Sequence, residues 1–258
     1  MKLERAKGTQ DFLPEDKIKR DELIQTLKRI FERYGFNPLE TPLIERFSVL
    51  SAKFSGGEDI LKETFKLKDQ GGRELGLRYD LTVPFARVMA MNSQLKMPFK
   101  RYQIGRVYRD GPIKLGRYRE FYQCDVDVVG SSNVSADVEL LNIAKDVFNA
   151  LGINVVIKLN NMALLKELLE QCGVSSKDIP QAVVSVDKLE KIGKANVKKE
   201  LISNGIPQKS VNKVLTYILV EGTNTQKIKK LKELGDLKNL SIIEETLKLV
   251  PSLTFVPS

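Results

Sequence analysis

The stretch of residues 99–130 constrains the fold of this 258-residue chain more than any other. Residues 100–108 and 119–129 both alternate between side-chain types with the period of two that a β-strand imposes. A basic loop that contains an Asp-Gly-Pro sequence at 110–112 separates them, and this composition favours a turn. The pattern therefore predicts an antiparallel hairpin, and with it a fold that contains an antiparallel sheet.

The second strand of this hairpin has two different faces. One face is mostly apolar and is predicted to pack in a core: Tyr122, Cys124, Val126 and Val128. The other face gathers charged and amide groups around a ring: Arg119, Phe121, Gln123, Asp125 and Asp127. Such a face, beside a glycine-containing loop with arginines, can hold a zwitterion and a nucleotide phosphate. An ordinary amphipathic hairpin with a polar outer face explains the same alternation, and the pattern alone does not decide between the two.

The charge of the chain favours an acidic partner. The formal net charge is +9, and residues 96–119 contain eight basic residues against one acid, so the bias coincides with the hairpin. Nucleic acid is the first candidate for such a partner, although a high lysine content also serves solubility or thermal stability. The absence of histidine excludes Ser-His-Asp and Cys-His catalysis and histidine-ligated metal sites within this chain.

Cellular location is predicted from what the sequence lacks. The two cysteines, Cys124 and Cys172, have no CxxC spacing, so neither a disulfide framework nor a zinc site is indicated. No apolar run approaches the roughly 18 residues of a membrane-spanning helix, and the N-terminus lacks a signal-peptide pattern. We therefore expect a cytoplasmic protein with no membrane segment and no protein-bound metal.

The remaining elements of the first 160 residues alternate between helices and strands. Helices are predicted from Glu15 or Asp16 to Gly35, over 84–94 and over 135–151; residues 46–63 are predicted as helix or loop with a break at Gly56-Gly57. Pro38 and Pro42 favour an extended, edge-like segment or a simple turn. A second hairpin is predicted over 63–84, in which Arg78, Asp80 and Thr82 share one face and either bind an amine or simply face solvent. Antiparallel strands with interspersed helices predict the α+β class.

Composition changes near residue 160. Residues 161–248 are predicted to form a separate module of short helices at 162–172, 186–204, 208–220 and 225–234. Lysine dominates its charge, which allows contact with an RNA backbone, but a solvated lysine face explains it better because no arginine or aromatic cluster accompanies it. Residues 249–258 are predicted to start a strand that returns to the first domain, which spans 1–160.

Several motifs in residues 1–160 resemble those of histidyl-tRNA synthetases, in the order and spacing of that family. They are Gly8-Thr9-Gln10-Asp11, Pro42 after a long helix, Leu77–Thr82 and Gly116–Asp125. The variants Tyr79-Asp80-Leu81 and Tyr122-Gln123-Cys124-Asp125 are like those of archaeal and eukaryotic members. The resemblance implies a class II synthetase fold, an antiparallel sheet flanked by helices in a homodimer, with 161–248 in the position of the helical insertion domain.

The resemblance also implies roles for single residues. Arg109 matches the catalytic arginine that holds the ATP α-phosphate and the amino acid carboxylate. Phe121 matches the ring on which adenine stacks, and Arg117 lies in the loop that contacts nucleotide phosphates and the acceptor end of tRNA. The implied histidine-binding residues are Asp80, Leu81, Thr82, Arg109, Gln123 and Asp127. Pro42 lies in the segment that resembles the dimer contact.

The implied activity is that of a histidine–tRNA ligase. Histidine and ATP, which brings Mg²⁺, would form histidyl-adenylate and pyrophosphate, and histidine would then pass to tRNA(His). In the family, a histidine-specific Arg-Gly-Leu-x-Tyr-Tyr-Thr-Gly stretch, a third motif and an anticodon-binding domain follow at the point where this sequence ends at Ser258. We therefore expect a truncated fragment with weak or no ligase activity on its own.

Two other interpretations remain open. The regulatory subunit of ATP phosphoribosyltransferase shares this fold but makes no adenylate, so the intact run Gly116–Phe121 together with Arg109 argues against it. A nucleic-acid-binding protein built on an inactive synthetase domain would instead bind RNA tightly and in a salt-sensitive way, without any effect of ATP.

Overall fold

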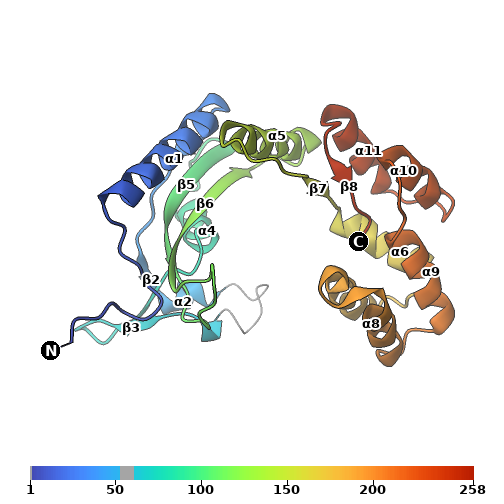
Figure 1. The fold of residues 1–258 in the computed structure, drawn as a ribbon, viewed down its shortest axis with the longest axis horizontal. Helices are drawn as coiled ribbons and strands as arrows, with labels where there is room; N and C mark the ends of the chain where they lie inside the picture. The colour runs from blue at the N-terminus through green and yellow to red at the C-terminus, as the bar shows by residue number, and fades with distance from the viewer. Residues whose placement is uncertain (1, 53–60) are drawn as a thin grey trace. The chain divides into compact units, whose positions relative to one another are not determined.

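The computed structural model describes residues 2–52 and 61–258, and the chain divides into two compact units, Met1–Ala150 and Leu151–Ser258 (Figure 1). The predicted break at Gly56-Gly57 lies outside the described residues. None of the helices in the part of the chain that is described combines the length and apolar content needed to cross a membrane.

The predicted hairpin is confirmed and forms the centre of the first unit. Strands β5 (Phe99–Tyr108) and β6 (Glu120–Val129) are ten residues each and pair in antiparallel register, with Arg101 opposite Asp127 and Val107 opposite Phe121. Strand β1 (Asn37–Pro38) adds in parallel to β5, so the sheet order is β1-β5-β6. The proline-rich segment therefore lies at a sheet edge, where a missing backbone N–H is tolerated.

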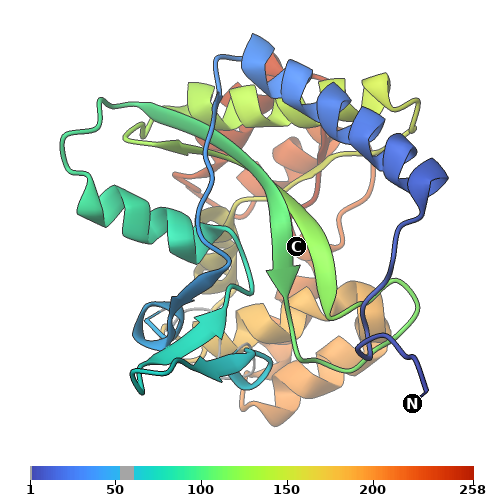
Figure 2. The same cartoon turned by 90° about the vertical axis from the view of Figure 1, so that its left-hand side faces the viewer.

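Two helices cover one face of this hairpin. Helix α1 (Pro14–Arg33) begins with Pro14, Glu15 and Asp16, residues suited to a helix N-terminus, and the predicted stop Gly35 has a φ of +74°. Helix α5 (Val134–Ala150) lies beside α1 (Figures 1 and 2). Their shared core contains Ile30, Phe31, Phe36, Tyr102 and Ile143.

The apolar face of β6 is only partly a core face. Val126 and Val128 pack against the core beneath α1 and α5, as predicted. Tyr122 and Cys124 are exposed, so their prediction as core residues is wrong. The physical reason is that the buried cluster ends at Val126, and the Tyr122 ring instead lies 5.1 Å from the guanidinium of Arg20 on α1.

The first unit also contains a second, smaller sheet. Its strands are β2 (Ile44–Arg46), β3 (Lys66–Lys68) and β4 (Glu74–Leu77), in the order β2-β4-β3. Helix α2 (Phe47–Leu50) follows β2 in the chain, and helix α4 (Thr82–Met91) follows β4. The prediction that Arg78, Asp80 and Thr82 share a strand face is wrong, because β4 ends at Leu77. Asp80 Oδ1 accepts a hydrogen bond from the Val83 N–H at 3.0 Å and thereby supports the start of α4.

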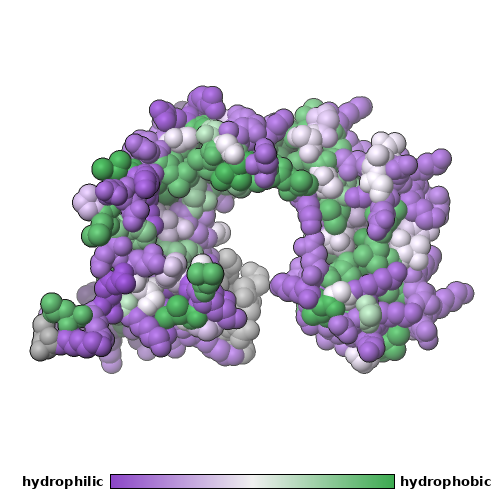
Figure 3. Space-filling model, in the orientation of Figure 1, coloured by the Kyte–Doolittle hydropathy of each residue, from purple (hydrophilic) through white to green (hydrophobic). Residues whose placement is uncertain are grey.

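The second unit is helical. It contains α6 (Met162–Gln171), α7 (Ile179–Asp187), α8 (Leu189–Ser203), α9 (Gln208–Ile218), α10 (Asn224–Lys232) and α11 (Leu240–Leu249). Leucines of α6 are buried, whereas the view in Figure 3 shows a mostly hydrophilic surface on this unit. The lysines of the unit are therefore consistent with a solvated surface.

The boundaries of this unit differ from the predicted ones. It begins at Leu151, about ten residues before the change in composition, and α7 and α11 were not predicted as separate helices. Strand β8 (Thr254–Phe255) pairs in parallel with β7 (Lys158–Leu159), which lies within residues 1–160, so the predicted return of residues 249–258 to the first domain stays a prediction. Asn224 holds β8 in place, because its side chain bonds the backbone of Leu253 and Phe255 at 2.7 and 2.9 Å.

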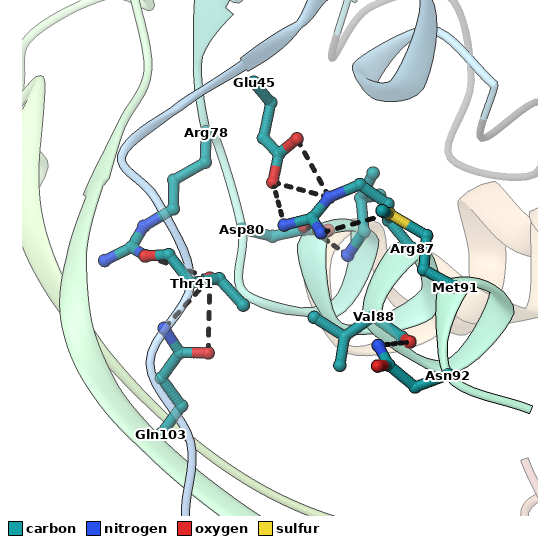
Figure 4. A network of polar contacts seen from close by, with 10 residues as sticks. Thr41, Glu45, Arg78, Asp80, Arg87, Val88, Met91, Asn92 and Gln103 are labelled. Atoms are coloured by element: carbon teal, nitrogen blue, oxygen red, sulfur yellow. Dashed lines mark hydrogen bonds and ion pairs between the residues drawn. The ribbon is translucent and has the colours of Figure 1, made fainter. Parts of the chain in front are cut away.

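A buried ion pair joins strand β2 to helix α4. Glu45 of β2 is only 6% exposed, and both of its oxygens accept from Arg87 of α4 at 2.7–3.1 Å (Figure 4).

Arg87→Leu would leave this carboxylate buried without its cation, so we expect the free energy of unfolding in urea to fall by about 3 kcal/mol. The matched control is Arg73→Leu, which breaks an exposed ion pair with Asp69 and should cost far less. Equal losses in the two variants would contradict the assignment.

Candidate active site

The loop end of the β5–β6 hairpin surrounds a cavity of about 640 Å³. Its lining includes all three residues predicted to bind ATP: Arg109, Arg117 and Phe121. The guanidinium of Arg109 lies 5.2 Å from the centroid of the Phe121 ring. A positive charge beside an aromatic face suits a nucleotide, which presents a phosphate and a flat base together.

Arg109 is held by two neighbouring segments. Its backbone N–H donates to the Arg119 carbonyl at 2.8 Å, which extends the β5–β6 ladder by one pair. Its side-chain Nε donates to the Tyr79 carbonyl at 3.1 Å. Because Tyr79 directly precedes Asp80, this bond brings the predicted phosphate-binding arginine next to the turn that carries three of the predicted histidine-binding residues.

The loop between the strands is anchored to Glu63, a residue that the sequence analysis missed. The Asp110 N–H donates to the Glu63 carbonyl at 2.6 Å, and Arg117 Nη2 donates to both Glu63 carboxylate oxygens at 3.0 and 3.1 Å. A Cβ at Gly111 would lie 2.7 Å from the same carboxylate, so a larger residue there would displace the Glu63 side chain from its present position. No local pattern links residue 63 to this loop, and the contact is visible only in the fold.

A second cluster of charge lies along the hairpin, around Arg101. This arginine is fully buried, and its Nη2 lies 2.6 Å from Asp127 Oδ2 and 4.0 Å from Asp125 Oδ2. Nη2 also donates to the Leu81 carbonyl at 3.3 Å, and the guanidinium lies 4.3 Å from the centroid of the Phe85 ring. Arg101 was not predicted as a site residue, and Asp125 was predicted only as a member of the charged face of β6, although the register of the two strands brings Arg101 opposite Asp127.

Burial and charge compete in this cluster. Burial raises the pKa of Asp127, and Arg101 opposes that rise. Burial also raises the pKa of Asp125, and the negative charges of Asp127 and Asp80 raise it further. The positive charge of Arg101 and a hydrogen bond from Thr82 lower the same pKa. The influence of Asp80 and Thr82 on Asp125 indicates that the turn before α4 and strand β6 converge here. Within residues 2–52 and 61–258, no group of three or more acidic, cysteine or histidine side chains is arranged to hold a metal ion.

The other predicted histidine-binding residues belong to the same region. Leu81 is completely buried and contributes its carbonyl rather than its side chain. Gln123 lies on β6 opposite Gly105, and its Oε1 is buried without a hydrogen-bond partner in the described structure. Arg78, in contrast, is structural: it donates to the backbone carbonyls of Thr41 at 2.6 Å and Arg106 at 2.9 Å. Pro42, the predicted dimer-contact residue, follows Thr41 on the exposed segment before β2.

Comparisons with known proteins identify relatives of the chain. The family model for histidyl-tRNA synthetase matches residues 8–254. Histidine–tRNA ligase 1 of Bacillus cereus is 46% identical over 219 residues, which are 85% of this chain and 51% of that protein. The crystal structure of histidyl-tRNA synthetase from Nostoc sp. PCC 7120 has a TM-score of 0.86 at 30% identity and covers 100% of this chain and 61% of its own.

A further solved structure shares the fold. An ATP phosphoribosyltransferase regulatory subunit/histidyl-tRNA synthetase from Bacillus halodurans has a TM-score of 0.85 at 20% identity, covering 100% of this chain and 68% of its own. At that identity the likeness concerns the fold alone. The relatives named here are bacterial, and the chain spans about half the length of the curated relatives it matches.

The contacts of Glu63 predict the behaviour of the loop at 110–118. Glu63→Gln removes the ion pair to Arg117, so we expect trypsin to cleave the folded protein after Lys114 and Arg117 roughly two- to fivefold faster. Timed digestion followed by mass spectrometry measures these two rates. The control is Glu74→Gln, at an exposed glutamate of β4, which should leave both rates unchanged. Unchanged rates in Glu63→Gln would show that its carboxylate does not anchor the loop.

Proposed function

Because the chain belongs to the histidyl-tRNA synthetase family, we propose that it forms the part of a histidine–tRNA ligase that binds and activates histidine. One observation carries this proposal. Arg109 lines the nucleotide-sized cavity and is bonded through Nε to the carbonyl that precedes Asp80. A phosphate-binding arginine and a carboxylate suited to an ammonium group therefore lie in adjacent positions, as the joining of an amino acid to ATP requires.

The first step would be attack of the histidine carboxylate on the α-phosphorus of ATP, with release of pyrophosphate. In this proposal Arg109 neutralises charge on the α-phosphate and the substrate carboxylate, Phe121 stacks against adenine and Arg117 contacts the outer phosphates. Mg²⁺ accompanies ATP as part of the substrate, since it is bound mainly through phosphate oxygens. No covalent enzyme nucleophile is needed for this step.

The amino acid would bind through its ammonium group. Asp80 and Asp127 supply negative charge, Thr82 and Gln123 supply further polar contacts, and the Leu81 backbone closes the site. The buried, partnerless Oε1 of Gln123 supports this assignment, because an acceptor left without a donor in the protein is suited to a substrate N–H.

The second step would transfer histidine to the terminal adenosine of tRNA(His). The net charge of +9 and the basic loop support a nucleic-acid partner. We further propose that residues 1–160 are the catalytic core, 161–248 the helical insertion domain and 249–258 the start of a return to that core. The protein would be a cytoplasmic homodimer, and the contact between its two subunits would include Pro42. The closer likeness of two motifs to archaeal and eukaryotic members stays a prediction.

A second candidate function is that of the regulatory subunit of ATP phosphoribosyltransferase. The fold is compatible with it, because the Bacillus halodurans protein that shares this fold carries both descriptions. The cavity lined by Arg109, Arg117 and Phe121 argues against it, since a subunit that makes no adenylate has no need of a complete ATP loop.

The proposed activity predicts ATP–pyrophosphate exchange that depends on histidine. We expect the protein at its full natural length to incorporate labelled pyrophosphate into ATP when histidine and Mg²⁺ are present, and not when another amino acid replaces histidine. A folded protein that shows no exchange at all would favour the regulatory subunit. Exchange without amino acid selectivity would contradict the histidine assignment.

The role of Arg109 predicts a large loss of exchange activity in Arg109→Ala. By comparison with the loss of one oxyanion donor, we expect a cost of about 2.7–4 kcal/mol, or roughly a hundred- to thousandfold in rate. The control is Arg106→Ala: Arg106 lies on β5 three residues before Arg109, with the opposite side-chain direction, and is paired with Glu120. A loss below about tenfold in Arg109→Ala would refute the assignment.

A further inference from the structure

Arg101 is buried in a way that stability alone does not explain. Its side chain has no exposed surface, and its Nε and Nη1 have no hydrogen-bond partner within the described parts of the chain. Burying a guanidinium is costly unless all of its donors are satisfied, and an apolar side chain of similar size often serves stability equally well. The position therefore carries a charge for a reason other than packing.

The surroundings of Arg101 are arranged for a cation. Asp127 and Asp125 lie at 2.6 and 4.0 Å from its Nη2, and Asp80 also acts on it electrostatically. When all three carboxylates are ionised, one guanidinium balances only one of them, which leaves a net charge of −2 around the cluster. Asp127 Oδ2, although within ion-pair distance of Arg101, accepts no hydrogen bond from the described residues, and neither does Gln123 Oε1.

We propose that Arg101 is a positioning residue for amino acid binding, which holds Asp127 ionised and oriented so that this carboxylate can accept the α-ammonium group. The inference rests on the proposed function and goes beyond it, because it adds two residues, Arg101 and Asp125, to the site. Arg101 touches neither substrate nor ATP in this arrangement. It acts through Asp127, which is its direct cross-strand partner, and Asp125 completes the charge balance.

The physical argument concerns like charges in a buried site. Without Arg101, Asp125 and Asp127 would lie on the same face of β6 with no cation between them. Asp127 raises the pKa of Asp125, so without a cation between them we expect one of the two carboxylates to take up a proton more readily. A protonated or displaced Asp127 would bind an ammonium group poorly, whereas the ATP cavity at the far end of the hairpin would be unaffected.

The test compares substrate affinities in four variants of the full-length enzyme. Arg101→Met should raise KM for histidine roughly ten- to hundredfold in pyrophosphate exchange, with KM for ATP changed less than about threefold. Arg101→Lys keeps the charge and should stay within about fivefold of wild type for histidine. Arg101→Met/Asp125→Asn removes one charge of each sign and should recover part of the loss. Arg106→Met, an arginine on the opposite face of β5, is the matched control and should change neither constant.

The outcomes separate this inference from the proposed function. If wild type shows no exchange with histidine, the proposed function fails, and calorimetric titration of histidine into the same variants still tests Arg101. If wild type is active but folded Arg101→Met keeps its KM for histidine, or loses histidine and ATP affinity together, the inference is overturned. If Arg101→Met does not fold, the other two variants decide. Arg101→Lys must keep KM for histidine within about fivefold of wild type, and the double variant must raise KM for histidine more than KM for ATP. Unchanged histidine affinity in the double variant overturns the proposal.

Discussion

The register of the β5–β6 ladder is the constraint on which the rest of the first unit depends. Because side chains alternate along a strand, this one alignment determines that Arg101 faces Asp127 and that Phe121 lies near Arg109. A slip of one residue would send the carboxylates of β6 to the side of α1 and α5 and bring Val126 and Val128 out of their core. The apolar contacts on one face and the charged cluster on the other therefore support the same register.

Glycine at two positions lets neighbouring segments approach this ladder. A Cβ at Gly105 would lie 2.5 Å from Arg78 Nη2, so the absence of a side chain there lets Arg78 reach the carbonyls of Thr41 and Arg106. In Figure 4, Arg78, Thr41 and Gln103 meet in one network that connects the segment before β2 to β5. At the loop end, the absence of a side chain at Gly111 leaves room for the Glu63 carboxylate. Both contacts bring distant parts of the chain to the hairpin without displacing its strands.

How much the sequence predicts depends on the range of the interaction. The hairpin, the long first helix, the Gly35 stop and the α+β class follow from local periodicity and turn residues, and the structure agrees. The end of β4 was misjudged because alternation continues through Asp80 in the sequence, whereas a hydrogen bond from the Val83 N–H turns the chain into α4. Glu63 and Arg101 were missed for a different reason. Their roles depend on contacts with residues 20 to 54 positions away, which no local pattern records.

Arg87 and Arg101 show how a structural ion pair differs from a binding site. Arg87 and Glu45 satisfy each other through three short contacts from one guanidinium to one carboxylate, and this arrangement is complete without any ligand. Arg101 is more deeply buried, yet it leaves donors on itself and acceptors on Asp127 and Gln123 without partners in the described residues. A fold under selection for stability alone would not keep such groups buried, since each unsatisfied group costs free energy that the core must offset. The acceptors on Asp127 and Gln123 are therefore suited to a substrate donor such as the ammonium group of an amino acid, which Arg101 supports from behind through Asp127.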